Sequence, residues 1–324
     1  MCAGGGGQVC GQRDGSEYSR VMSVVRTREQ LGPDVVRLAV DAPRVARFWQ
    51  PGQFVIVRVL AGGERIPLTV VEGDPAAGTV TLVVQVVGLT TRLLAAVPAG
   101  GRIADVAGPL GQPGEVRPAA RTVVVAGGVG SAVALPRIRG LRAAGLPVTT
   151  LLGAASAARL TLRRELAAAS TVLQVCTEDG SAGVRGVVTD LLEAELTAAA
   201  ERGVAYDWVL TAGPVPMMAA VADVAAAVGL PATASLNPLM VDGTGMCGGC
   251  RVRVEGTSRF ACVDGPEFDA HQVDFALLAR RNRAYADQER AAAAAPGGGA
   301  TGPAGALQAA GDADGLPAVP AAVG

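Results

Sequence analysis

The chain has 324 residues, with 28 basic and 29 acidic side chains and a formal net charge of −1. This near-neutral balance argues against the basic surface of proteins that bind nucleic acids or anionic membranes. The length exceeds the roughly 250–300 residues at which a single hydrophobic core stops growing, so two or three domains are expected.

Residues 1–17 form a glycine-rich leader without the basic and apolar regions of a secretory signal, and we expect it to be disordered. Six cysteines are too few for a disulfide scaffold in a chain of this length, which indicates a reducing, cytoplasmic compartment. The uncharged run 224–241 is interrupted by glycine and proline, so no membrane insertion is expected.

Residues 18–118 contain short apolar stretches separated by glycine and proline, a pattern that predicts an antiparallel barrel. In the stretch ERIPLT, Arg65 is suited to pair with a phosphate, and the Thr69 hydroxyl is suited to reach a flavin ring nitrogen. Segments 88–91 and 108–111 offer small residues and amides to a nucleotide, although each is more often a turn. The candidate residues of this domain are Arg65, Pro67, Leu68, Thr69, Gly88, Thr90, Gly108 and Gly111.

Residues 119–234 alternate apolar strands with Ala- and Leu-rich helical stretches, which predicts a doubly wound parallel sheet. Gly127, Gly128 and Gly130 follow the first strand and precede a helix, as in a turn that holds a pyrophosphate; the alternative is a merely tight turn. Asp179 and the pair Gly213 and Pro214 follow later strands, at the edge where such sheets bind ligands.

Residues 235–285 carry Asp242, Cys247, Cys250 and Cys262 in the spacing D-x4-C-x2-C-x11-C. This is the plant-type iron–sulfur pattern with a carboxylate at the first position, and it favours electron transfer. Two alternatives stay open: a structural zinc site, and Asp242 as a turn residue before a glycine. Residues 286–324 form a low-complexity tail that we expect to bury no core.

The motifs ERIPLT, GPLG, GGVG, TEDGSAG, AGPVPMM, VDGTGMCGGC and FACVDGPEF follow one another along nearly all of residues 18–285. In this order they resemble the ferredoxin–NADP reductase superfamily with a C-terminal [2Fe-2S] module. The most similar members are small flavin subunits of the type found in NADH-dependent ferredoxin:NADP oxidoreductase, sulfide dehydrogenase and dihydroorotate dehydrogenase. Leu68 departs from the superfamily pattern, because it replaces the tyrosine of the flavin-binding box.

The resemblance implies FAD in the barrel, NAD(H) on the parallel sheet and a [2Fe-2S] cluster held by Asp242, Cys247, Cys250 and Cys262. It implies an electron-transfer subunit that acts with a large glutamate-synthase-like flavoprotein subunit, and with ferredoxin through that subunit. The alternative function is electron transfer from dihydroorotate to NAD, which Asp242 disfavours because that relative typically has four cysteines. A zinc-stapled, non-redox binding module is the second alternative.

Overall fold

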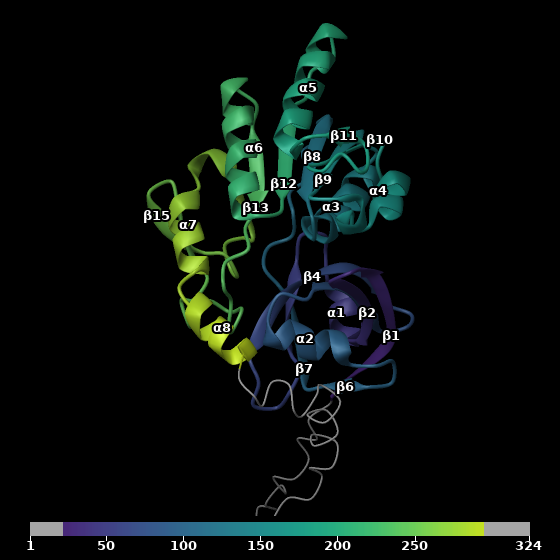
Figure 1. Ribbon diagram of the computed structural model, residues 1–324, viewed down its shortest axis with the longest axis vertical. Coiled ribbons are helices and arrows are strands. Elements are labelled where there is room, and N and C mark those ends of the chain that lie inside the picture. Colours follow the sequence, from purple (N-terminus) through teal and green to yellow (C-terminus); the bar gives the residue numbers. More distant parts are fainter. Residues whose placement is uncertain (1–21, 295–324) are drawn as a thin grey trace, which may run out of the picture.

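Figure 1 shows the computed structural model of the chain, in which residues 22–294 are described. Two seven-stranded sheets lie one above the other in this view, and the C-terminal segment runs along one side of both. The expected leader, 1–17, and residues 295–324 of the expected tail lie outside the described part. No helix within residues 22–294 is long and apolar enough to cross a membrane.

The first sheet is antiparallel throughout, with the strand order β6-β1-β2-β5-β4-β3-β7. Buried and less buried side chains alternate along its strands. In β2, Val36, Leu38 and Val40 enter one core while Arg37 and Ala39 are less buried. This confirms the predicted antiparallel fold, in the form of a half-barrel. The elements are β1 Ser23–Gly32, β2 Val35–Asp41, α1 Pro43–Phe48, β3 Phe54–Arg58, β4 Arg65–Asp74, β5 Thr79–Gln85, α2 Leu89–Ala96, β6 Arg102–Ile103 and β7 Asp105–Leu110.

The second sheet has the order β11-β10-β9-β8-β12-β13-β16 and is parallel except at β16, which confirms the predicted doubly wound sheet. All six residues of β8 are buried, because Val123 and Val125 pack with α5 and α6 while Val124 and Ala126 pack with α3 and α4. The elements are β8 Thr122–Gly127, α3 Gly130–Ala143, β9 Val148–Ala154, η1 Ala157–Arg159, α4 Arg163–Ala169, β10 Val172–Thr177, β11 Val184–Arg185, α5 Val188–Glu201, β12 Trp208–Ala212, α6 Val215–Ala227 and β13 Ala232–Ser235.

The third segment, which follows β13, is joined to the second sheet by its strand β16. Ser235 of β13 pairs antiparallel with Glu267 of β16, so the segment completes the edge of the sheet. Ala286–Ala294, assigned from sequence to the tail, forms helix α8, which approaches α2 of the half-barrel. The elements are β14 Arg251–Val254, β15 Thr257–Phe260, β16 Glu267–Asp269, η2 Ala270–Gln272, α7 Phe275–Asn282 and α8 Ala286–Ala294.

A buried ion pair fastens this third segment to α3. Arg137 Nε lies 2.7 Å from Glu267 Oε1, and the Arg137 side chain is 1% exposed. The N–H does not point along the line between the two atoms, so the contact is an ion pair and not a linear hydrogen bond. Burial raises the pKa of Glu267, and the Arg137 charge opposes this rise. Loss of either partner would leave the other charge buried and unpaired, which destabilises the fold.

We expect Glu267→Gln to lower the free energy of unfolding by about 3 kcal/mol or more, because it leaves the Arg137 charge buried and uncompensated. Thermal unfolding should show a Tm lower by about 5–10 °C. Glu72→Gln is the control, since the Arg139–Glu72 pair is exposed and such pairs contribute less than about 1 kcal/mol. Equal Tm values for the two variants would contradict the stabilising role of the buried pair.

Candidate functional site

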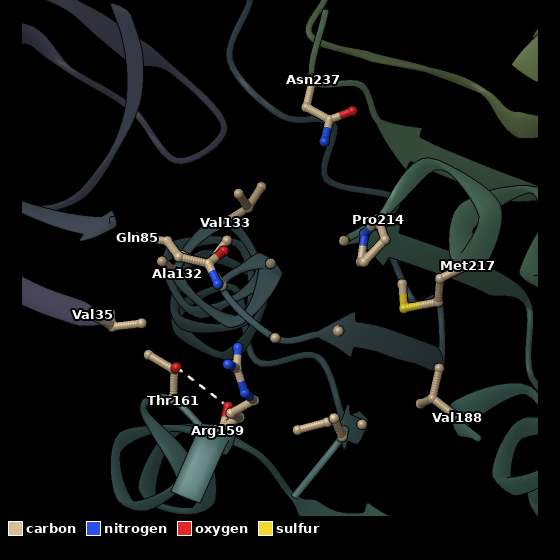
Figure 2. A pocket seen from close by; sticks show the side chains of 18 of the residues that line it. Val35, Gln85, Ala132, Val133, Arg159, Thr161, Val188, Pro214, Met217 and Asn237 are labelled. Carbon is tan, nitrogen blue, oxygen red and sulfur yellow. Dashed lines mark hydrogen bonds between the residues drawn. The ribbon is translucent and has the colours of Figure 1, made fainter. Parts of the chain in front are cut away.

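A cavity of about 980 Å³ lies between the half-barrel and the carboxyl edge of the parallel sheet (Figure 2). It lies where the strand order of the sheet reverses, between β8 and β12, which is where such sheets bind ligands. β4, β5 and the start of α2 form one wall, and the segments that follow β8, β9, β10, β12 and β13 form the other. The predicted residues that line it are Pro67, Leu68, Thr69, Gly127, Gly128, Gly130, Gly213 and Pro214.

The turn after β8 has the shape of a phosphate cradle. Gly128 has φ +54°, and a Cβ added there would meet nothing within 4 Å, so it would project into open space. At Gly130 a Cβ would lie 2.2 Å from the Ala212 carbonyl oxygen, so only glycine lets α3 start this close to β12. No side chain caps α3, and Gly128, Val129 and Gly130 at its start line the cavity, so its positive N-terminal end is open to an anion there.

Six residues that the sequence predicted as cofactor contacts do not line the cavity: Arg65, Gly88, Thr90, Gly108, Gly111 and Asp179. Arg65 is exposed at the start of β4, opposite Arg58. The Thr90 hydroxyl donates to Glu64, while Thr91, one helical step further, lines the cavity. Gly88 is the N-cap of α2 and lies outside the lining.

The GPLG segment, which comprises the last three residues of β7 and Gly111, contacts the third segment. At Gly111, which has φ +75°, a Cβ would lie 3.0 Å from Pro266 Cδ, and at Gly108 a Cβ would lie 2.8 Å from Val55. These two glycines therefore permit close packing between β7 and its neighbours.

Asp179 accepts hydrogen bonds from the Ser181 hydroxyl at 2.6 Å and the Ser181 amide at 2.9 Å, which lower the pKa of this exposed carboxyl. Its neighbour Glu178 lines the cavity in its place. Sequence analysis also missed cavity residues that follow strand ends, such as Asn237 and Met217 (Figure 2). The sequence did contain a pattern that could have identified them, because the runs SLNPLM and AGPVPMM start at the ends of β13 and β12, where ligands bind in such sheets.

The cysteine loop, residues 240–250, packs against strands β3 and β7 of the half-barrel. Gly243, with φ +74°, lies so close to β7 and β3 that a Cβ would be 2.6 Å from Leu110 Cδ1 and 2.9 Å from Ile56 Cγ1. β3 pairs with β4, which lines the cavity. Neighbouring strands of one sheet therefore carry the cavity and the loop.

Two of the four predicted ligands lie side by side. The sulfurs of Cys250 and Cys262 are 3.1 Å apart and buried, and both are free thiols. Burial, followed by contact with Cys250, raises the pKa of the Cys262 thiol to about 12. A thiol that resists ionisation in this way needs a cation to become a thiolate ligand, and iron or zinc supplies that cation.

The other two predicted ligands lie at the loop surface. Asp242 Oδ2 accepts from the Cys247 amide at 2.6 Å, and Oδ1 accepts from the Thr244 amide at 2.9 Å. The Thr244 bond, then that from Cys247, lowers the pKa of Asp242. No three acidic, thiol or imidazole side chains within residues 22–294 gather around one point. A two-iron cluster takes its ligands in pairs, one pair per iron, so the buried Cys250–Cys262 pair and the glycine-rich turn fit that group.

Comparison with known proteins also identifies an iron–sulfur domain in this part of the chain. Residues 237–274 match the family model for the iron–sulfur cluster-binding domain of dihydroorotate dehydrogenase B. The chain is 44% identical to a dihydroorotate dehydrogenase B (NAD(+)) electron transfer subunit homolog of Thermotoga maritima, over 81% of this chain and 90% of the relative. It is 36% identical to a probable subunit of this kind from Methanopyrus kandleri, over 78% and 90% of the two chains.

A solved structure extends the likeness to the fold. A chain of an NADH-dependent reduced ferredoxin–NADP oxidoreductase, studied for flavin-based electron bifurcation, is 40% identical with a TM-score of 0.78, over 84% of this chain and 96% of that one. These findings confirm the resemblance seen in the sequence and the cofactor set of FAD, NAD(H) and a [2Fe-2S] cluster. The chain therefore belongs to the family of dihydroorotate dehydrogenase B-type electron-transfer subunits, which are NAD(H)-dependent flavin and iron–sulfur oxidoreductase subunits that act with another subunit.

Proposed function

We propose that this chain passes electrons between NAD(H), FAD and a [2Fe-2S] cluster to a large glutamate-synthase-like flavoprotein subunit, and through that subunit to ferredoxin. The observation that carries the proposal is the arrangement of the half-barrel: β4 lines the cavity, while Ile56 of β3 and Leu110 of β7 support the cysteine loop. Nicotinamide exchanges hydride, a flavin divides the electron pair, and an iron–sulfur cluster accepts single electrons.

The residues of the cavity divide into two groups in this proposal. Thr69 and its neighbours on β4 hold FAD from the half-barrel side. Arg65, exposed at the start of the same strand and outside the cavity lining, pairs with the FAD pyrophosphate. The glycines that precede α3 hold the NAD(H) pyrophosphate, and Gly213 with Pro214 lies on the nicotinamide side. The residues shield the reacting groups from water and align them; no side-chain nucleophile is needed.

The proposed acceptor docks over the cysteine loop. Met246 is 88% exposed and precedes the exposed Cys247, and Val241 is 52% exposed and precedes Asp242. Exposed apolar side chains beside a redox centre favour protein contact, because burying them excludes water from the path between the two centres.

Purified chain supplied with NADH should reduce artificial dyes but show negligible ferredoxin:NADP activity until the partner subunit is added. The matched variant is Met246→Glu, which should weaken the response to the partner and leave dye reduction unchanged, because a charge at the docking surface opposes its desolvation. Full ferredoxin:NADP turnover by the single chain would contradict the proposed partner dependence.

A second candidate function is electron transfer between dihydroorotate and NAD, which the names of the two curated relatives favour. Asp242 argues against it, since the family resemblance implies a fourth cysteine at this position in the typical dihydroorotate enzyme. Stable co-purification with a dihydroorotate dehydrogenase would favour this candidate. A colourless protein with one zinc and no flavin would favour the non-redox alternative.

We expect Asp242→Cys to retain a cluster but to change its reduction potential and EPR signal, because thiolate and carboxylate donate charge differently to iron. Asp242→Asn is the companion variant: it loses the charge, and its single amide oxygen can accept from only one of the Thr244 and Cys247 amides. An Asp242→Cys protein with an unchanged spectrum and potential would show that Asp242 only organises the turn.

A further inference from the structure

The turn between Cys247 and Cys250 consists of two glycines, and the carbonyl group of each accepts a hydrogen bond from an arginine. Arg251 Nε donates to the Gly248 carbonyl at 3.1 Å, and Arg281 Nη2 donates to the Gly249 carbonyl at 3.1 Å. Arg251 is the first residue of β14 and follows the turn directly, whereas Arg281 belongs to the last turn of α7. A helix distant in the chain thus supplies a cation to the segment between two predicted cluster ligands.

The two arginines differ in burial. Arg251 is exposed, whereas Arg281 is only partly exposed and its Nε atom is buried without a hydrogen-bond partner. Neither arginine forms an ion pair within residues 22–294. The dipole of α7 favours a cation in its last turn, but the end of a helix carries only a partial negative charge. Arg281 therefore brings an uncompensated positive charge to the cysteine loop.

The end of α7 is fixed beside the loop by a second contact. Asn282, which follows Arg281, donates from Nδ2 to the Asn237 carbonyl at 3.1 Å. Asn237 lies in the segment that leads from β13 to the cysteine loop. The guanidinium of Arg281 is therefore held against the loop by the backbone of its own helix.

The contact with Gly249 also orients a ligand. Because a peptide group is planar, the Arg281 bond to the Gly249 carbonyl fixes the plane of the peptide that enters Cys250. Cys250 is the predicted ligand whose sulfur lies 3.1 Å from that of Cys262. Arg281 thus acts on the buried ligand pair through the backbone, without touching a sulfur.

The charge of Arg281 has a consequence for electron transfer. Reduction of a [2Fe-2S] cluster adds one electron, and hence one negative charge, to a site whose four predicted ligands are already anionic. A fixed cation nearby stabilises the reduced state more than the oxidised state, and so raises the reduction potential. Water and salt screen the exposed Arg251 more strongly than the partly buried Arg281.

We propose that Arg281 is a positioning residue for the cluster: it orients the Gly249–Cys250 peptide, and its charge raises the reduction potential of the bound cluster. The inference rests on the proposed function, because it takes Cys250 as a ligand of a cluster that carries electrons. It goes beyond that function in placing control of the potential on α7, outside the cysteine loop. A higher potential makes the cluster a better acceptor of one electron from reduced FAD.

The test is a redox titration of the isolated chain loaded with FAD and cluster, in which EPR measures the reduced cluster at each solution potential. Arg281→Gln removes the charge but keeps a polar amide. At a fixed solution potential it should lower the ratio of reduced to oxidised cluster about 10-fold, a shift of about −59 mV for one electron. Arg281→Lys keeps the charge but loses the planar fork, and its ratio should stay within about threefold of the wild-type value.

Arg251→Gln is the matched control, because it removes the same charge and the same kind of hydrogen bond at an exposed position. The ratio should change less than about threefold in this variant, and the change should vanish in about 1 M salt. The Arg281→Gln shift should persist in the same salt, since a partly buried charge is screened less. Arg281→Lys decides the matter even where Arg281→Gln loses the cluster.

Three results would overturn the proposal. An Arg281→Gln chain with full iron content and an unchanged potential would mean that the charge does not act on the cluster. Equal shifts in Arg251→Gln and Arg281→Gln would mean that the net charge of the segment is sufficient. A 10-fold lower ratio in Arg281→Lys would mean that the positive charge does not set the potential. The titration contains no partner subunit, so absence of transfer to that subunit would refute the proposed function and leave this result unaffected.

Discussion

Cys250→Ser and Cys262→Ser should each reduce the iron content of the purified chain to less than about one tenth of the wild-type value. The two sulfurs face each other at 3.1 Å in the interior of the third segment, and no other described cysteine lies beside them to substitute. A serine hydroxyl is a harder and far less acidic ligand than a thiol, so it does not replace a thiolate on iron. Cys247→Ser should have a similar but smaller effect, because that residue is at the exposed rim.

Iron and acid-labile sulfide per chain, together with the visible spectrum, measure this result. Cys176→Ala is the matched control: Cys176 is also buried, at the end of β10, where burial raises the pKa of its thiol to about 11, but it lies in the parallel sheet. Replacement of Cys2 or Cys10, which lie outside the described residues, should also leave the iron content unchanged. Full iron content in Cys262→Ser would remove this residue from the proposed ligand set.

Alanine substitutions in the turn after β8 should have large effects, on stability at Gly130 and on NAD(H) binding at Gly128. Gly130→Ala should unfold the parallel sheet at a markedly lower temperature, because the new Cβ would lie 2.2 Å from a backbone oxygen of β12 that has no room to move. Gly128→Ala should keep most of the stability, with a cost of about 1–2 kcal/mol for an alanine at positive φ. Its methyl group would instead enter the cavity and weaken NAD(H) binding by about 10-fold or more.

Thermal unfolding and NADH titration of both variants separate the two effects. Gly62→Ala serves as a control, since a Cβ there also meets nothing within 4 Å but Gly62 does not line the cavity. Unchanged NADH affinity in Gly128→Ala would mean that the pyrophosphate does not cross this turn.

Sequence patterns predicted those parts of the protein that depend on neighbours in the chain. The two-residue alternation of β2 marks a sheet with one buried face, and the continuous apolar run 123–126 of β8 marks a sheet with two. The spacing of Cys247, Cys250 and Cys262 is likewise a local property, and it was sufficient to favour an iron–sulfur site. Glycine turns such as 127–130 were recognisable because strand, turn and helix follow directly along the chain.

Tertiary structure alone decided which of two adjacent residues enters the cavity. Thr91 and Glu178 line it where the sequence favoured Thr90 and Asp179, since the phase of a helix start or of a turn is set by packing. The ion pairs Asp34–Arg159 and Arg137–Glu267 were also beyond sequence analysis. Their partners are more than one hundred residues apart in the chain, and they meet only because two sheets and a returning edge strand bury apolar surface together. Local pattern thus determined the chemistry that this chain carries, while long-range packing determined where that chemistry is placed and which charges face it.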